Sequence, residues 1–233
     1  MKKKYSTITI AVFLLICSHG IQGQSVKDSD GNTYNSVKIG TQVWMAENLK
    51  TTKLNDGTLI PLVTDIHSWN LLTSPAYCWF KNDASYNKSN YGALYNWYVV
   101  NTNKLCPAGW HVPTDGEWTT LLTYLGGDSI AGGKLKEKGT VHWEKPNYQA
   151  SNESGFNALP SGYINTSGVF TNFGKVCFWW SDMEYDKTNA WNFSIDCATE
   201  NIEKAFHLKK NGYSVRCIKD NEDVKTTISR NKK

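Results

Sequence analysis

Apolar residues recur at helical spacing in one segment of this chain and alternate with polar residues in several others. Trp118, Leu121, Leu122 and Leu125 stand at positions i, i+3, i+4 and i+7, which places them on one face of a helix. A helix with one wide apolar face must be covered by a sheet or by another helix. We therefore expect this segment to organise the core.

The ends of this helix are marked as clearly as its apolar face. Thr114 is a natural N-cap, and Glu117 three residues later completes a capping box. Asp115 and Glu117 put negative charge in the first turn, where the helix dipole favours it. Gly126 and Gly127 supply the left-handed cap that ends a helix.

Alternating apolar positions predict strands towards both ends of the domain. In residues 26–50, four apolar residues alternate around a turn at Gly40 and Thr41: Val37, Ile39, Val43 and Met45. From residue 156 onward, short apolar runs are separated by turn residues. Asn211 and Gly212 predict a hairpin turn before a closing strand at 213–220.

The middle of the chain is expected to hold the helices. Residues 50–90 are loop-rich, with a short strand candidate at 77–80 and a polar loop after it. Residues 91–101 predict a short aromatic-rich helix, whereas the glycines and polar residues of 131–155 predict mostly loop. We expect one loop-rich α+β domain in which two helices pack on a largely antiparallel sheet.

The N-terminus has the pattern of a secretion signal. Three lysines precede an apolar stretch at residues 8–16 that is too short for a stable membrane anchor. Cleavage after Gly23 makes 1–23 the signal peptide, 24–220 the domain and 221–233 a disordered polar tail. Cys17 raises the alternative of a lipoprotein, but Ile16 is not the small residue that a lipobox needs. The expected location is the periplasm, the outer surface or the medium, with no transmembrane span in the mature chain.

The formal charge of +4 comes from the two ends of the chain. Three basic residues lie in the signal and four in the tail, which leaves 18 basic against 19 acidic residues in 24–220. Such a neutral domain has no electrostatic footprint for nucleic acid.

Five cysteines remain after the signal, and export permits disulfide bonds. A bond between Cys106 and Cys217 would tie the helix to the last strand. Antiparallel pairing centred near Lys187 would bring Cys177 opposite Cys197. Spacing does not settle the connectivity, and Cys78 is left over. No Cys-x-x-Cys occurs and the histidines are scattered, so no zinc site is expected.

Seven motifs in order resemble the Fibrobacter succinogenes major paralogous domain: WMAENLKT, YGALYNWY, CPAGWHVPTDGEW, AGGKLKE, NESGFNALPSGY, FWWS and SVRCIKD. The resemblance covers about residues 26–220. It implies an exported bacterial domain, often found in lipoproteins or surface proteins, and implies no defined activity.

A more distant similarity is to formylglycine-generating enzymes, which have a C-type-lectin-like fold. The arrangement that carries it is HVPTDGEW before a helix, then WWS, then a closing GYSVRC. The similarity implies a bond from the cysteine before the first helix to the final strand, where Cys106 and Cys217 fall. Those enzymes bind copper through two closely spaced cysteines, whereas Cys177 and Cys197 are twenty residues apart.

Few residues point to catalysis. No G-x-S-x-G, phosphate loop or H-E-x-x-H occurs. His111 lies close to Asp115 and Glu117, but helix capping already accounts for both carboxylates. Dispersed carboxylates of a hydrolase remain open.

The sugar site of C-type lectins is expected to be absent in its usual form. Lys145-Pro146-Asn147 and Trp191-Asn192-Phe193 lack the acidic residues that the calcium loops of those lectins carry. A different cation site, with calcium as the possible ion, is left open on Asp182, Glu184 and Asp186 of the loop that follows Ser181. Asp182, Glu184 and Asn192 are candidate ligand-binding residues.

The content of ten tryptophans and twelve tyrosines is the remaining clue. Exposed aromatic rings bind sugars and anchor protein interfaces. Trp79, Trp143 and Tyr148 lie in loop-like surroundings and are predicted to be on the surface. Trp179 and Trp180 are adjacent on one strand and should face opposite sides.

We therefore expect a non-enzymatic binding module that recognises glycan or protein at the cell envelope. The alternatives are an enzyme of the formylglycine-generating-enzyme superfamily, and a structural envelope protein whose aromatic residues are core.

Overall fold

The computed structural model describes residues 25–221 as a mixed α/β fold of five helices and short, mostly antiparallel sheets. The predicted signal peptide, Cys17 and all but the first residue of the predicted tail lie outside the described residues. Within them, no helix has the length and apolar character needed to cross a membrane.

The first two strand pairs confirm the strands predicted within residues 26–50. β1 (Val26–Lys27) pairs with β2 (Thr33–Tyr34), and β3 (Ser36–Ile39) pairs with β4 (Gln42–Met45) around the Gly40 turn. β3 and β4 are the first two strands of a four-stranded sheet of order β3-β4-β13-β7. The chain's last strand, β13 (Ile218–Lys219), therefore lies between β4 and β7 (Trp110–His111).

A three-stranded antiparallel sheet forms the other large element. Its strands are β10 (Val176–Glu184), β11 (Asn189–Asp196) and β12 (Glu203–Leu208), with β11 in the centre. Two small pairs complete the strands: β5 (Tyr77–Cys78) with β6 (Leu94–Tyr95), and β8 (Tyr163–Ile164) with β9 (Phe170–Thr171).

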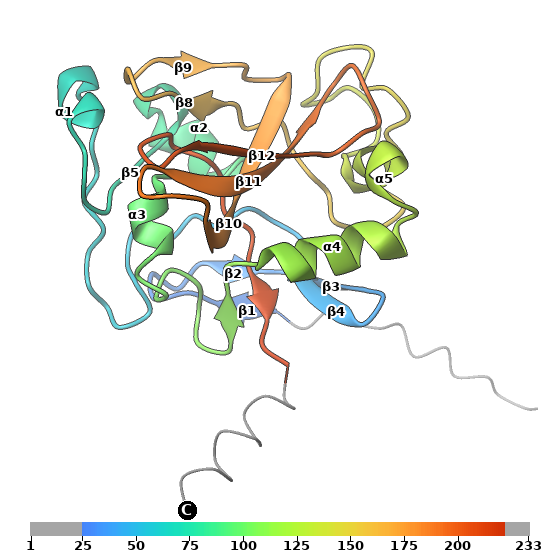
Figure 1. Cartoon of the computed structure of the whole chain (residues 1–233), viewed down its shortest axis with the longest axis horizontal. Helices are drawn as coiled ribbons and strands as arrows, with labels where there is room; N and C mark the ends of the chain where they lie inside the picture. Colours follow the sequence, from blue (N-terminus) through green and yellow to red (C-terminus); the bar gives the residue numbers. More distant parts are fainter. Residues whose placement is uncertain (1–24, 222–233) are drawn as a thin grey trace, which may run out of the picture.

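The organising helix is α4 (Asp115–Tyr124), and its predicted capping box at Thr114 and Glu117 is present. α4 lies between the three-stranded sheet and the β3–β4 hairpin (Figure 1). Trp118 on its buried face stacks on Phe193 of β11 with ring centroids 4.7 Å apart, and contacts Trp44 of β4 at 5.0 Å. The apolar stripe of α4 therefore joins the two sheets.

The described residues form five helices, three more than the two that were predicted. The others are α1 (Ile66–Asn70), α2 (Ala84–Asn90), α3 (Trp97–Val100) and α5 (Asp128–Leu135), with a 3-10 turn at Phe80–Asn82. α2 replaces a predicted polar loop. α3 is all that forms of the helix predicted over 91–101.

The glycines of α5 explain why that helix was predicted as loop. A Cβ on Gly132 would lie 2.2 Å from the carbonyl oxygen of Asn201, and one on Gly133 would lie 2.7 Å from that of Gln149. These glycines allow backbone to pack directly against the helix, and they do not interrupt it.

The predicted hairpin at Asn211 and Gly212 is also wrong. The segment after Gly212 pairs with β6 at Tyr213 and with β10 at Ser214. Gly212 is required there because an added Cβ would lie 2.3 Å from the side chain of Ile164.

Trp179 and Trp180 face opposite sides of β10, as predicted, but both sides are covered. Trp179 packs in the cluster around Trp118, and Trp180 packs in the cluster around Tyr213. Both are fully buried.

The disulfide bond between Cys106 and Cys217 is present. The second predicted bond is wrong, because Cys177 and Cys197 are free thiols, as is Cys78. At its turn the β10–β11 hairpin has the predicted centre, since Glu184 pairs with Ala190.

A β-bulge between Trp180 and Glu184 then shifts the register. Four positions along β10 face two along β11 in this stretch. Cys177 therefore pairs with Ile195, two positions short of Cys197.

Candidate functional site

A charged cluster surrounds His111 at the start of α4. β7 places this histidine between two carboxylates: Nδ1 is 2.8 Å from Asp220 and Nε2 is 2.9 Å from Glu117. The hydrogen bond to Glu117, followed by that to Asp220, raises the pKa of His111 to about 9. Both ring nitrogens contact carboxylates, so the imidazole has no nitrogen left to act as a general base.

Glu117 is equally occupied. Its carboxylate accepts hydrogen bonds from the backbone N–H and the hydroxyl of Thr114 at 2.9 Å each, in addition to His111. Burial raises the pKa of Glu117, but the bonds from His111 and Thr114 outweigh it and lower the pKa below the usual value.

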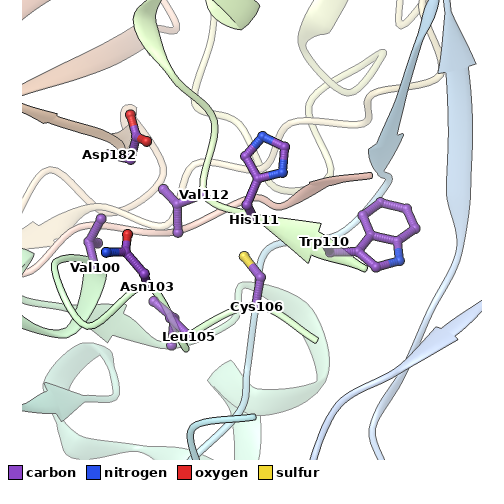
Figure 2. Close-up of a pocket in the computed structure, with 8 residues that line it drawn as sticks. All are labelled: Val100, Asn103, Leu105, Cys106, Trp110, His111, Val112 and Asp182. Carbon is purple, nitrogen blue, oxygen red and sulfur yellow. The ribbon is translucent and has the colours of Figure 1, made fainter. Parts of the chain in front are cut away.

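A small pocket of about 50 Å³ opens beside this cluster (Figure 2). Figure 2 shows its lining, drawn from the end of α3 and the turn after it, from β7 and from β10: Val100, Asn103, Leu105, Cys106, Trp110, His111, Val112 and Asp182. Since a protein cavity that holds benzene has about 150 Å³, this pocket has no room for a sugar ring.

Asp182 is the one acidic residue of this pocket. Its Oδ1 is buried without a hydrogen-bond partner. Burial, with the nearby charge of Glu117, raises the pKa of Asp182 to about 6. A raised and a lowered carboxyl pKa side by side are typical of glycosidases. Here the pocket is too small and Glu117 is fully occupied, so the pair does not form such a site.

The candidate calcium ligands do not come together. Glu184 makes an ion pair with Lys209 at 3.2 Å, and Asp182 lines the pocket beside His111. Asn192 is fully buried, and its amide donates to the carbonyl of Ala205. Among residues 25–221 no three His, Cys, Asp or Glu side chains are grouped to hold a metal ion.

Two of the three predicted surface aromatics are buried. Trp79 is 4% exposed and contacts Tyr77 edge to face at 5.7 Å. Trp143 is 2% exposed, and its indole N–H donates to the carbonyl of Ala158 at 2.9 Å. Their placement on the surface was wrong because packing from distant segments covers these loops. Tyr148 is 47% exposed, as predicted.

An exposed aromatic cluster lies on the outer part of the three-stranded sheet. Tyr185 stacks on Phe206 with centroids 3.9 Å apart and planes 5° from parallel. Trp191 meets both rings edge to face, at 5.0 and 5.8 Å. Tyr185 is 46% exposed, Phe206 is 45% exposed and Trp191 is half-buried. We call Tyr185, Trp191 and Phe206 the aromatic patch.

Charged residues fix the patch to α4. The ammonium of Lys204 lies 4.1 Å from the centre of the Trp191 ring and 2.7 Å from Oδ2 of Asp115. Oδ1 of Asp115 accepts a hydrogen bond from Ser181 of β10. The rings therefore have fixed positions without any ligand.

Sequence reasoning missed this patch. Trp191 directly faces Phe206 only because β11 pairs with β12 in one particular register. The sequence signal that could have found it is that Tyr185 lies in a predicted turn while Trp191 and Phe206 lie in the two predicted strands that follow.

The model of the Fibrobacter succinogenes major domain matches residues 37–219. The chain belongs to this family. The matched residues of this Fibrobacter succinogenes major domain include the disulfide bond, His111 of β7, the helix α4 and the aromatic patch. No curated protein and no solved structure matches the chain.

Proposed function

We propose that this domain is an exported, non-enzymatic module that binds carbohydrate at the bacterial cell envelope. The observation that carries the proposal is the aromatic patch, where rings from β11, from β12 and from the turn between β10 and β11 lie side by side on the surface. The apolar C–H faces of sugar rings pack on aromatic faces, and stacked rings that are already ordered lose little entropy on binding.

Polar groups around the patch supply the hydrogen bonds that a sugar needs. Lys204 lies over Trp191, and the carboxylate of Asp186 is held in place by Thr188 and Asn189. Carboxylate and ammonium groups next to aromatic rings suit a ligand with many hydroxyl groups and no strong charge. Binding is expected to be independent of calcium, since the candidate calcium ligands lie apart.

We also propose a C-type-lectin-like fold for this domain. The Cys106–Cys217 bond, which links the entry of α4 to the final strand, supports it, as do the antiparallel sheets.

The enzyme alternative has less support. A copper site on Cys177 and Cys197 requires thiolates, and burial raises the pKa of the Cys177 thiol. The hydroxyl of Ser161 lies 3.3 Å from that thiol, in the core.

The test is binding of the chain without its signal peptide to a panel of polysaccharides, with and without EDTA. Tyr185→Ala and Phe206→Ala should each weaken binding by about tenfold or more. Tyr148→Ala is the matched control, because Tyr148 is equally exposed and lies outside the patch. EDTA should have no effect.

Three results would contradict the proposal: no binding to any polysaccharide, full binding by both patch variants, or loss of binding in EDTA. The domain could instead bind a protein and no polysaccharide, with that binding lost in Tyr185→Ala and Phe206→Ala. In that case the patch is a protein-docking surface and the carbohydrate assignment is wrong.

A further inference from the structure

The outer strand of the three-stranded sheet, β12, has one edge without a neighbour. β12 pairs with β11 and with no other strand among residues 25–221. Its pairing with β11 runs through six residues without a shift in register. An edge of this length offers a row of backbone donors and acceptors to another chain.

The side chains of β12 do little to protect this edge. The strand contains no proline and no glycine, and its one lysine is Lys204. Edge strands are commonly protected by lysines, which keep other chains away. Here the ammonium of Lys204 is turned back across the sheet, 4.1 Å from the centre of the Trp191 ring and 2.7 Å from Oδ2 of Asp115. The lysine therefore leaves the edge accessible.

Alternate residues of β12 direct their backbone groups to that edge. The backbone N–H of Lys209 donates to the carbonyl of Thr188 at 2.9 Å, so these two residues form a directly opposed, hydrogen-bonded pair. Such pairs recur at every second residue of an antiparallel ladder. His207, Ala205 and Glu203 therefore bond to β11. The residues that direct their N–H and C=O groups outward are Lys204, Phe206 and Leu208.

These three outward residues also share one face of the sheet, because side chains alternate along a strand. It is the face of the aromatic patch, to which Phe206 belongs. Phe206 is 45% exposed and Leu208 is 46% exposed. A strand added at this edge would therefore meet open backbone groups and apolar side chains together.

We propose that this edge pairs with the same edge of a second copy of the domain, antiparallel and about a two-fold axis at Phe206. A two-fold axis requires a self-complementary surface, and this register provides one. Phe206 lies opposite Phe206 of the second copy, and Lys204 lies opposite Leu208. All three outward residues of each copy thus face outward residues of the other.

Other registers lose contacts. An axis at Ala205 leaves Leu208 opposite Ile202, whose N–H already donates to the carbonyl of Asp128 at 2.9 Å. An axis at Lys204 places two lysines directly opposite each other, and like charges in that position destabilise a sheet. The axis at Phe206 avoids both, and it sets two aromatic rings opposite each other, which stabilises paired strands.

Sedimentation velocity of the chain without its signal peptide, with no polysaccharide present, measures the association. We expect a monomer at micromolar protein concentration and a dimer as the concentration approaches millimolar. A monomer throughout this range would overturn the proposal.

Opposite charges at position 206 test the axis itself. Phe206→Lys and Phe206→Glu each place like charges opposite each other, and each should dimerise more weakly than the wild type by about tenfold or more. An equimolar mixture of the two variants should dimerise again, because lysine then lies opposite glutamate. A mixture that stays monomeric, or single variants that dimerise as the wild type does, would refute the axis at Phe206.

Two controls locate the surface. Tyr148→Lys is matched to Phe206→Lys, because Tyr148 is 47% exposed and lies outside β12; it should dimerise normally, and loss of the dimer there would contradict the assignment to β12. Tyr185→Ala, which is expected to weaken polysaccharide binding, should also dimerise normally, since Tyr185 lies in the turn before β11. Dimerisation and carbohydrate binding can therefore fail or hold independently.

Discussion

Removal of the Cys106–Cys217 bond by a double substitution to alanine should cost this domain most of its stability. The bond joins residues 111 positions apart. In the chain-entropy description, opening a loop of that length returns about 16 cal/mol/K to the unfolded chain, or about 4.8 kcal/mol at room temperature. Domains are stable by only about 5–15 kcal/mol in total, so the variant should be marginally folded.

Urea unfolding under non-reducing conditions measures this loss directly. Cys78→Ala is the matched control, because Cys78 is a free and fully buried cysteine, and it reports the cost of losing a core sulfur without losing a cross-link. The slope of the transition should also rise in the double variant, since its unfolded chain is more expanded. Reduced wild-type protein should behave like the double variant. A loss no greater than twice that of Cys78→Ala would refute the reasoning.

Three further perturbations have defined outcomes. His111 has a folded pKa of about 9, above the value of about 6.5 in an unfolded chain; its contribution to stability is therefore complete below pH 6.5 and is lost as the pH rises through 9. Because the ring is partly exposed, we expect a loss of about 1 kcal/mol between pH 6 and 10, seen as a lower urea midpoint that His111→Asn does not show. Lys136 is fully buried and donates to three backbone carbonyls, those of Tyr148, Asp196 and Thr199; Lys136→Met should lower the free energy of unfolding by about 3 kcal/mol, and a loss below 1 kcal/mol would contradict this role. Thr114→Ala removes the capping box of α4 and should cost about 1 kcal/mol, whereas Thr119→Ala, on the exposed face of the same helix, should cost much less.

Features with local causes could be predicted before the structure was known. The capping box of α4, its apolar stripe and the β3–β4 turn all arise from contacts between residues a few positions apart. The centre of the β10–β11 hairpin near Lys187, which was placed midway between Cys177 and Cys197, is found at the turn. The three helices that form in segments predicted as loop, α1, α2 and α5, show the limit. In α5, Gly132 and Gly133 allow close packing against distant backbone.

The candidate site depended on contacts between residues that are far apart in the sequence. Trp79 and Trp143 lie in segments with loop-like sequences, yet distant segments bury them. Tyr185 and Phe206 are exposed because nothing in the described part of the chain covers that end of the sheet. Exposure is a property of the whole fold, so residue type alone could not separate these two groups.

By itself, the sequence determined the family and the organising helix with both of its ends, and the resemblance to lectin-like folds implied the pairing of Cys106 with Cys217. Only the tertiary structure decided the strand registers. The bulge in β10 changes the partner of Cys177 by two positions and leaves two thiols unbonded, and the register of β11 on β12 brings Trp191 opposite Phe206. Register results from the simultaneous packing of both sheet faces against distant segments, and no short stretch of sequence contains that balance.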